Sequence, residues 1–304
     1  MAPARAELKG LVAQELSQPV APAVTAMAEA VRARHGKSAV AVLFYGSCLR
    51  KPEMLLSDSL LDFYLLVDDY RAAYDSGLLA FANRLLPPNV FYLELPQPGG
   101  TLRCKYAVLT LDQFAAGTSR DALNVSLWAR FSQPARLLWS RDAATADRVA
   151  EACVEAVLTM LGNVRPLVQS SDAEVLWRRA FEATYAAELR SETSDRATEL
   201  VRLDLDRYQR VTAPALELLR EQGNDLSADE SAALWRKRRR VGKLLNLARL
   251  AKATFTFQGA LDYVLWKVRR HSGVELQVTD WQRRHPLLSA PVLAWRLYRR
   301  GAFR

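Results

Sequence analysis

Ala39-Val40-Ala41-Val42-Leu43-Phe44-Tyr45-Gly46-Ser47 is the stretch that decides the expected fold, an apolar run of strand length that ends in Gly-Ser. A second strand-like run, Leu61–Asp69, follows and has an acid, Asp62, near its start. Short apolar blocks rich in Val and Phe are typical of buried strands. Glycine lets the backbone approach a ligand closely, and a serine amide and hydroxyl can donate to phosphate oxygens. The two runs therefore predict neighbouring strands with a phosphate-binding turn beside a carboxylate.

A strand ending in Gly-Ser, followed by a strand with an acid, is typical of the nucleotidyltransferase fold. In nucleotidyl transfer an oxygen nucleophile attacks the α-phosphate in line while pyrophosphate leaves, and carboxylates hold the divalent ion that neutralises the developing charge. The pattern predicts that Tyr45, Gly46 and Ser47 contact the triphosphate and that Asp62 binds Mg²⁺.

A second metal-binding carboxylate is not evident on the strand of Asp62. The common version of the fold has Asp-x-Asp, because alternate strand residues share a face about 6.6 Å apart. Tyr64 occupies that position here, and Asp68 has the right parity but lies roughly 20 Å further along an extended strand. The remaining candidates are Asp58, in the loop before the strand, and Glu94, on the third expected strand.

The two halves of the chain differ in their periodicity, which predicts an α+β protein: a nucleotidyltransferase-fold mixed sheet with flanking helices (residues 1–142), then a mostly helical C-terminal domain (residues 143–304). The expected strands are Ser38–Tyr45, Leu61–Val67, Val90–Leu95, Arg103–Thr110 and Ala135–Trp139. The expected helices are Ala23–Ala33, Tyr74–Leu86, Ser126–Phe131, Ala143–Leu161, Asp172–Arg190, Thr193–Tyr208, Ala213–Gln222, a long helix from Ala228, and Ala260–Arg270. Ser227 and Glu230 form a capping-box pattern at the start of the long helix.

Composition limits the class of protein. The chain has 304 residues, of which 50% are apolar, and this favours a folded protein over a disordered or fibrous one. No apolar run is long enough to cross a bilayer, and the N-terminus lacks the continuous hydrophobic core of a secretory signal. The three cysteines, without CxxC or paired histidines, predict free thiols in a reducing compartment, and Cys48 is expected to be a small loop residue.

The net charge of +9 favours an anionic partner, either nucleic acid or an acidic lipid surface, although it can also serve solubility alone. The densest basic run is Arg236–Arg240, and the C-terminal segment interleaves arginines with Leu, Trp and Tyr. No recognised nucleic-acid module accompanies these cations. Arginine with Trp and Tyr suits the lipid headgroup layer, so we expect an anionic membrane surface rather than nucleic acid as partner. The alternative is a last helix packed on the body with solvated arginines.

Four ordered blocks resemble the family of mitochondrial phosphatidate cytidylyltransferases, of which the chain would be a bacterial-type homologue. The blocks are Phe44–Ser47, Leu61–Asp69, Lys105-Tyr106-Ala107-Val108-Leu109-Thr110 and Leu127–Arg136, with a looser match over Arg249–Lys267 that includes Lys252. The family also has a single Asp followed by apolar residues, as in Asp62-Phe63-Tyr64. The sequence departs from the family pattern at Cys48, Ala107 and Ala129, each of which stands where the family tends to have Gly.

The resemblance implies a Mg²⁺-dependent enzyme that converts CTP and phosphatidate into CDP-diacylglycerol and pyrophosphate in phospholipid biosynthesis. It implies that Lys105 and Arg130 contact the triphosphate or the lipid phosphate, for which an arginine fork is geometrically matched and a lysine acts as a point charge. The expected location is the cytoplasm, peripheral on the inner face of the cell membrane. Two alternatives stay open: a soluble nucleotidyltransferase that modifies a small molecule, protein or RNA, and a non-catalytic binding module of the same fold.

Overall fold

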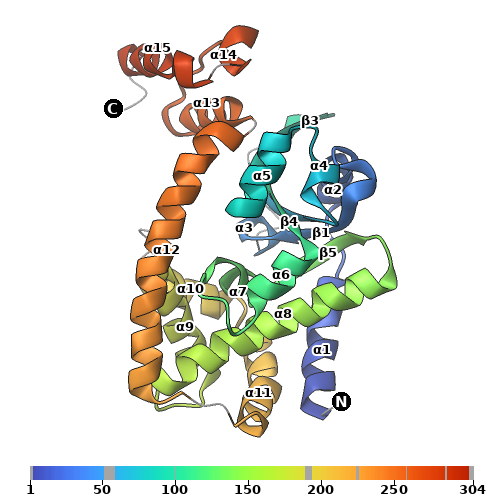
Figure 1. Cartoon of the computed structure of the whole chain (residues 1–304), viewed down its shortest axis with the longest axis vertical. Coiled ribbons are helices and arrows are strands. Elements are labelled where there is room, and N and C mark those ends of the chain that lie inside the picture. Colours follow the sequence, from blue (N-terminus) through green and yellow to red (C-terminus); the bar gives the residue numbers. More distant parts are fainter. Residues whose placement is uncertain are drawn as a thin grey trace.

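The computed structural model of the chain is shown in Figure 1. It describes residues 3–50, 59–98, 100–188, 194–223, 226–257, 259–284 and 286–300. Within these residues the protein is α+β: one mixed sheet flanked by helices, with a helical C-terminal region. The expected fold class is confirmed at this level.

The sheet has five strands in the order β3-β4-β2-β1-β5. β2 and β4 are parallel, and the other neighbouring pairs are antiparallel. Each expected strand is present, and β1 is buried along nearly its whole length, as its unbroken apolar sequence predicts for a central strand. The strands are β1 (Ala39–Tyr45), β2 (Leu60–Val67), β3 (Asn89–Gln97), β4 (Gly100–Thr110) and β5 (Ala135–Ser140).

The register of the sheet aligns the residues that the sequence singles out. Tyr45 lies opposite Asp62 on β2, and Asp62 lies opposite Lys105 on β4. Directly opposed residues have their side chains on the same face of a sheet, whereas successive residues of one strand alternate between faces. Tyr45, Asp62 and Lys105 therefore form one row across three strands, on a single face.

The opposite face of the sheet is apolar and is covered by α2, α4 and α5, with the short 3-10 helix η1 (Gly36–Ser38) before β1. Phe63 and Leu65 of β2 are fully buried there. His35 also lies on this face, where Nδ1 contacts the carbonyl oxygen of Ala73 and Nε2 contacts the hydroxyl of Tyr106. These helices are α2 (Pro22–Ala33), α4 (Tyr70–Ala73) and α5 (Gly77–Leu85).

Helices from both halves of the chain cover the face of the sheet that has the row of Tyr45, Asp62 and Lys105. One continuous cluster of buried apolar side chains extends from Ala4 on α1, through β1, β2 and β4, to Trp235 on α12. The sequence changes from mixed strand and helix periodicity to helical periodicity after residue 142, but the hydrophobic core continues across this point. The helices are α1 (Pro3–Leu16), α6 (Leu111–Thr118), α7 (Ser126–Phe131), α8 (Ala143–Val164), the 3-10 turn η3 (Arg165–Leu167), α9 (Ala173–Ala187), α10 (Ser194–Leu203), α11 (Leu205–Glu221) and α12 (Ala228–Thr256).

Three helix predictions were wrong in their boundaries: Thr193–Tyr208, Ala213–Gln222 and Tyr74–Leu86. The segment Thr193–Tyr208 is divided at Asp204, whose backbone is non-helical and whose carboxylate accepts a hydrogen bond from Arg50 Nε at 2.5 Å. α11 then continues through Pro214, which lacks the amide of a normal helical residue but is buried in the core. Tertiary contacts therefore override the local preference at both positions. The helix predicted over Tyr74–Leu86 is shorter than expected: Tyr74 is an extended residue that follows α4, and α5 begins only after its side-chain cap at Ser76.

α12 runs along one side of the molecule, from the helical half to the edge of the sheet (Figure 1). The expected capping box is present at its start, between Ser227 and Glu230. The basic run Arg236–Arg240 is not uniformly solvated, because Arg238 is buried between Trp128 and Trp235. Burial lowers the pKa of Arg238 to about 10.

The last three helices form a small unit at the end of α12, built around Leu276, Leu293 and Leu297. Gly259, with φ of +79°, begins this unit and packs closely on Tyr92 of β3. The positive φ and the close approach both favour glycine there. The helices are α13 (Ala260–Ser272), α14 (Asp280–Arg284) and α15 (Pro286–Arg299). None of the helices in the described ranges is both long and apolar enough to cross a membrane.

Candidate active site

The turn after β1 brings the Gly-Ser pair against Asp62. Gly46 has φ of +96°, and a Cβ added to it would lie 3.3 Å from Asp62 Oδ2. Both the backbone conformation and the contact favour glycine at this position. Ser47 begins the short helix α3 (Ser47–Arg50), so the expected triphosphate-binding residues and the expected metal ligand are adjacent.

Asp62 has one oxygen without a hydrogen-bond donor. The ammonium of Lys105 lies 3.2 Å from Asp62 Oδ1, but the pair lacks hydrogen-bond geometry, and Oδ1 is a buried atom with no donor among the described residues. A buried carboxylate oxygen is costly to leave without a partner. Asp62 therefore fits one ligand of a hard cation such as Mg²⁺, for which carboxylate oxygens are suitable ligands.

A cleft of about 480 Å³ lies over the row that contains Lys105. Its floor is the sheet, and its walls are α7, the end of α9 and the C-terminal part of α12. The lining residues are Tyr45, Phe63, Tyr64, Pro88, Val90, Lys105, Ala107, Ser126, Arg130, Glu188, Asn246, Arg249, Leu250, Lys252, Ala253 and Thr256. The structure thus brings Tyr45, Lys105 and Arg130 together in one cavity.

Arg130 is held by a buried acid that the sequence analysis missed. Its Nη1 donates to the carbonyl oxygen of Ser126 at 2.5 Å and lies 3.5 Å from Glu188 Oε1. Ser126 Oγ donates to the same carboxylate oxygen at 2.8 Å. Burial works against the charge of Arg130, but the combined fields of Glu188, Tyr64, Tyr45 and Asp62 outweigh it and raise the pKa of the guanidinium. Nothing in the sequence points to Glu188, since Arg130 lies on α7 and Glu188 follows the end of α9, so the two residues meet only in the fold.

Arg249 and Lys252 of α12 complete the cationic lining. Arg249 Nε donates to the carbonyl oxygen of Pro87 at 2.9 Å, and Lys252 Nζ donates to the carbonyl oxygens of Leu86 and Pro88 at 2.6 and 2.7 Å. Burial, together with the charge of Arg249, lowers the pKa of Lys252 to about 8. The looser block of the family resemblance includes both residues, and it is the one sequence feature that could have placed them in the site.

The described lining of the cleft has more positive than negative side chains. Lys105, Arg130, Arg249 and Lys252 line it, whereas Glu188 is the one acid in its lining among the described residues, and Asp62 lies 3.2 Å from Lys105 Nζ. Burial lowers the pKa of both Arg249 and Lys252, which indicates that their protonated forms are incompletely compensated. A cleft with desolvated cations in excess is suited to phosphate groups.

The two candidates for a second metal-binding carboxylate are not brought to Asp62. Glu94 lies on β3, two strands away, and its carboxylate accepts hydrogen bonds from Arg103 Nε at 3.0 Å and from the Tyr92 hydroxyl at 2.8 Å. Asp58 lies outside the described residues. Among the residues that are described, no group of three or more His, Cys, Asp or Glu side chains is arranged to hold a metal ion.

Cys48 is not an activated nucleophile. It is buried beside the Gly-Ser turn and donates Sγ–H to the carbonyl oxygen of Leu60 at 3.3 Å. Burial and the charge of Asp62 raise the pKa of its thiol, which disfavours the thiolate. The residue is therefore part of the packing beneath the turn.

Comparison with known proteins adds no family assignment. No family model matches the chain, and no curated protein matches it in sequence.

Proposed function

We propose that this chain is a phosphatidate cytidylyltransferase, which converts CTP and phosphatidate into CDP-diacylglycerol and pyrophosphate. The observation that supports this most is the position of Asp62, with a donor-free oxygen, between the Gly46 turn and a cleft lined by Lys105, Arg130, Arg249 and Lys252. A nucleoside triphosphate and a lipid phosphate are both polyanions, and the transfer reaction requires them in one cavity. The motif resemblance selects CTP and phosphatidate among such pairs.

The reaction is a displacement at phosphorus. A phosphate oxygen of phosphatidate attacks the α-phosphorus of CTP, a new P–O–P bond forms, and the bond to the β-phosphate breaks so that pyrophosphate leaves. The nucleophile is already ionised, so no general base is required. This agrees with the position of His35 on the opposite, apolar face of the sheet. The barrier is lowered mainly by positioning and by stabilising the charge that develops.

The proposed roles follow the geometry of the site. Gly46 and Ser47, with Tyr45 before them, approach the triphosphate through the turn, where a side chain on Gly46 would crowd Asp62. Asp62 would hold Mg²⁺, which when bound neutralises charge on the phosphate oxygens. Lys105, 3.2 Å from Asp62 Oδ1, is placed to contact the same phosphates as a point charge.

Arg130 is proposed to bind a phosphate group from the α7 wall of the cleft. Glu188 and the carbonyl oxygen of Ser126 fix its guanidinium, and an arginine fork matches phosphate geometry. Orientation by a buried acid lowers the entropy lost when the ligand binds. Arg249 and Lys252 face it from α12, so a phosphate bound between them would have cations on both sides.

The proposed membrane contact is the outer face of α15. Leu288, Val292 and Trp295 are exposed there at helical spacing, while Leu293 and Leu297 on the other face are buried in the small C-terminal core. Arg299 lies over the Trp295 ring at 4.9 Å. An apolar helix face with Trp and arginine suits the headgroup layer of an anionic bilayer. We therefore propose a cytoplasmic protein, peripheral on the inner face of the cell membrane, with no nucleic-acid partner.

The experiment that tests the proposal is pyrophosphate release from each of the four common nucleoside triphosphates with Mg²⁺. Each reaction is run with neutral vesicles and with vesicles that contain phosphatidate, beside an Asp62→Ala variant. The proposal expects release with CTP and phosphatidate together, lost in the variant. Removing residues 290–304 should weaken activity on vesicles more than activity on a short-chain, water-soluble phosphatidate.

Other outcomes identify the alternatives. Turnover without phosphatidate, or with another nucleotide, would favour a soluble nucleotidyltransferase. Nucleotide binding that needs neither Asp62 nor Mg²⁺, with no turnover under any of these conditions, would favour a non-catalytic binding module.

A further inference from the structure

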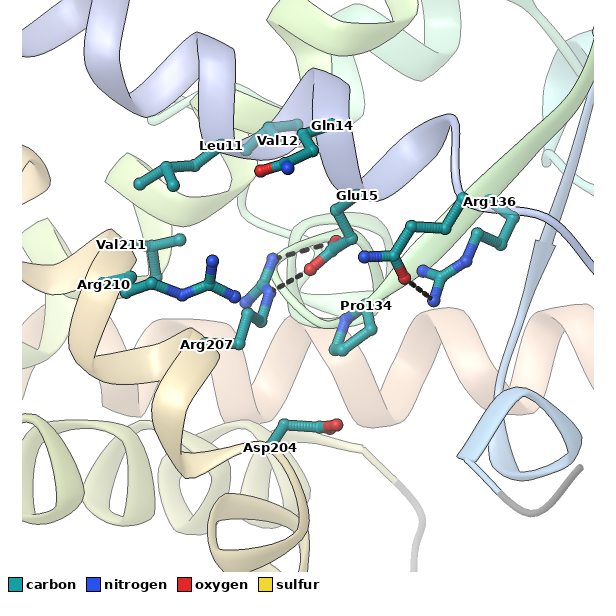
Figure 2. A pocket seen from close by; sticks show the side chains of 11 residues that line it. Leu11, Val12, Gln14, Glu15, Pro134, Arg136, Asp204, Arg207, Arg210 and Val211 are labelled. Carbon is teal, nitrogen blue, oxygen red and sulfur yellow. Dashed lines mark hydrogen bonds and ion pairs between the residues drawn. The ribbon is translucent and has the colours of Figure 1, made fainter.

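A second basic pocket lies between α1, the start of β5 and α11 (Figure 2). Its volume is about 240 Å³, and three arginines line it: Arg136, Arg207 and Arg210. Among the described residues, Glu15 and Asp204 are the acids in its lining. None of these five residues lines the cleft proposed as the active site.

Arg207 is the fixed part of the pocket. Its Nε donates to Glu15 Oε2 at 2.5 Å, and its Nη1 donates to the carbonyl oxygen of Ser132 at 2.6 Å. Its side chain is 10% exposed. Burial opposes the charge of this guanidinium, but Glu15, together with Tyr208 and Asp204, outweighs burial and raises its pKa. Glu15 is thus paired with Arg207, and no ion pair joins it to Arg136 or Arg210 among the described residues.

Not all hydrogen-bond donors of Arg136 have a partner among the described residues. Its Nη2 donates to Gln18 Oε1 at 2.5 Å and its Nη1 donates to the carbonyl oxygen of Ala135, but its Nε is buried with no hydrogen-bond partner among the described residues. Burial lowers the pKa of Arg136 despite the attraction of Glu15 and Asp204. Its positive charge is therefore incompletely compensated by the acids nearby.

Arg210 extends from α11 toward Arg207, whose own guanidinium points to Glu15 (Figure 2). No ion pair joins Arg210 to an acid in the part of the chain that the structure describes. Asp204, the remaining acid of the lining, accepts a hydrogen bond from Arg50 at 2.5 Å and belongs to that pair. With each acid assigned to one arginine, Arg136 and Arg210 leave two positive charges on the pocket.

The geometry points to a binding site for a phosphate-type dianion in this pocket, held between Arg136 and Arg210 with Arg207 as the fixed wall. A phosphate group carries up to two negative charges and accepts from several donors at once, which matches two uncompensated guanidinium groups. The site is separate from the proposed active site and does not depend on its function. The anion can be free in solution or part of a lipid headgroup, and both present the same chemistry.

The test is calorimetric titration of the full chain with inorganic phosphate and with pyrophosphate. All proteins in the set also have Lys105→Gln and Lys252→Gln, which remove two cations from the cleft so that its own anion binding is suppressed. Arg136→Gln and Arg210→Gln are the pocket variants, and Arg202→Gln, on the exposed end of α10, is the matched control. Arg207 is not substituted, because removing one partner of a buried ion pair destabilises the fold. Thermal melts check that each variant is folded.

Saturable binding that weakens about tenfold in each pocket variant, about 1.4 kcal/mol, and stays unchanged in the Arg202 variant supports a site for a free anion. A parallel set measures binding to phosphatidylcholine vesicles with and without phosphatidate. If the same two variants lose binding only to the vesicles that contain phosphatidate, a lipid headgroup is supported as the source of the phosphate. The inference is overturned if neither free anions nor vesicles distinguish the pocket variants from the Arg202 control.

Discussion

The two faces of the sheet are built from the same strands but have opposite chemistry. Phe63 and Leu65 of β2 face an apolar core closed by α2, α4 and α5. Asp62, one position before Phe63, lies in the row that faces the cleft with Lys105. Because successive strand residues alternate between faces, a single strand supplies both environments.

The difference shows how the fold isolates charge. On the apolar face the described polar groups are paired internally, as in the contacts of His35 with Ala73 and Tyr106. On the cleft face Asp62 has an oxygen without a donor, and burial lowers the pKa of Lys252 and Arg249. Incomplete satisfaction of polar groups is expensive for stability, so its concentration on one face favours a ligand-binding role for that face.

The largest effect is expected from Asp62→Asn, which keeps the shape of the side chain but removes its charge. CTP-dependent pyrophosphate release should fall at least about 10³-fold, roughly 4 kcal/mol, because the amide cannot replace a carboxylate as metal ligand. The thermal midpoint should change little. The matched control is Asp68→Asn, at the far end of the same strand, where the carboxylate pairs with Arg141 on the surface. A similar loss in both variants would remove the distinction between Asp62 and an ordinary strand acid.

The apolar face is tested by Leu65→Ala. Leu65 is fully buried between the sheet and its covering helices, so the substitution should lower the free energy of unfolding by about 3 kcal/mol through lost burial and a cavity. Denaturant titration measures this. Leu85→Ala is the control, since Leu85 is 72% exposed and its loss should cost less than about 0.5 kcal/mol. Equal costs at the two positions would contradict the assignment of this face as a packed core.

Gly46→Ala tests the turn that joins the strand to the site. The positive φ makes alanine unfavourable, and its Cβ would displace the Asp62 carboxylate, so we expect about 2 kcal/mol of destabilisation and a lower rate of transfer. Unfolding and pyrophosphate release are measured on the same preparation. Gly77→Ala is the control: Gly77 has no positive φ and no atom within 4 Å of an added Cβ. Gly77→Ala should leave the free energy of unfolding unchanged or raise it. A loss of activity in this control variant would argue against a specific role for the Gly46 turn.

The smallest effect is a pH dependence due to Lys252. Its pKa is lowered to about 8 in the folded protein, from 10.5, so its positive charge is lost as pH rises through that range. Nucleotide affinity should therefore fall above pH 8, by at most about tenfold per pH unit. Stability should change in the opposite direction, because the unfolded chain binds more protons than the folded one between pH 8 and 10.5.

Lys252→Arg distinguishes the titration of Lys252 from that of other groups, since arginine stays protonated throughout this pH range. Nucleotide titrations at pH 7, 8 and 9 should show a falling affinity in the original chain and a nearly constant affinity in the variant. An identical decline in both proteins would assign the pH dependence to another group.

Much of the fold followed from local pattern. The strands are near the expected positions, and α7 and the capping box of α12 are confirmed. One error falls where a distant residue decides the outcome, at Asp204, which pairs with Arg50, and another where the local cap at Ser76 sets the start of α5. In the candidate site the row of Tyr45, Asp62 and Lys105 could be anticipated from strand order and motif, whereas Glu188 could not, because nothing near it in the chain differs from an ordinary surface acid.

The sequence by itself determined the periodicity of the strands, the glycine turn at Gly46 and the acid at Asp62, because these depend on neighbours along the chain. Only the tertiary structure decided that Arg130 meets Glu188, that Lys252 is desolvated, and that Arg136 and Arg210 share a second pocket. Each of these depends on burial and on the field of residues brought from distant elements. Coulombic and desolvation energies act through space and fall off with distance and dielectric, so their effects appear only when the chain is folded.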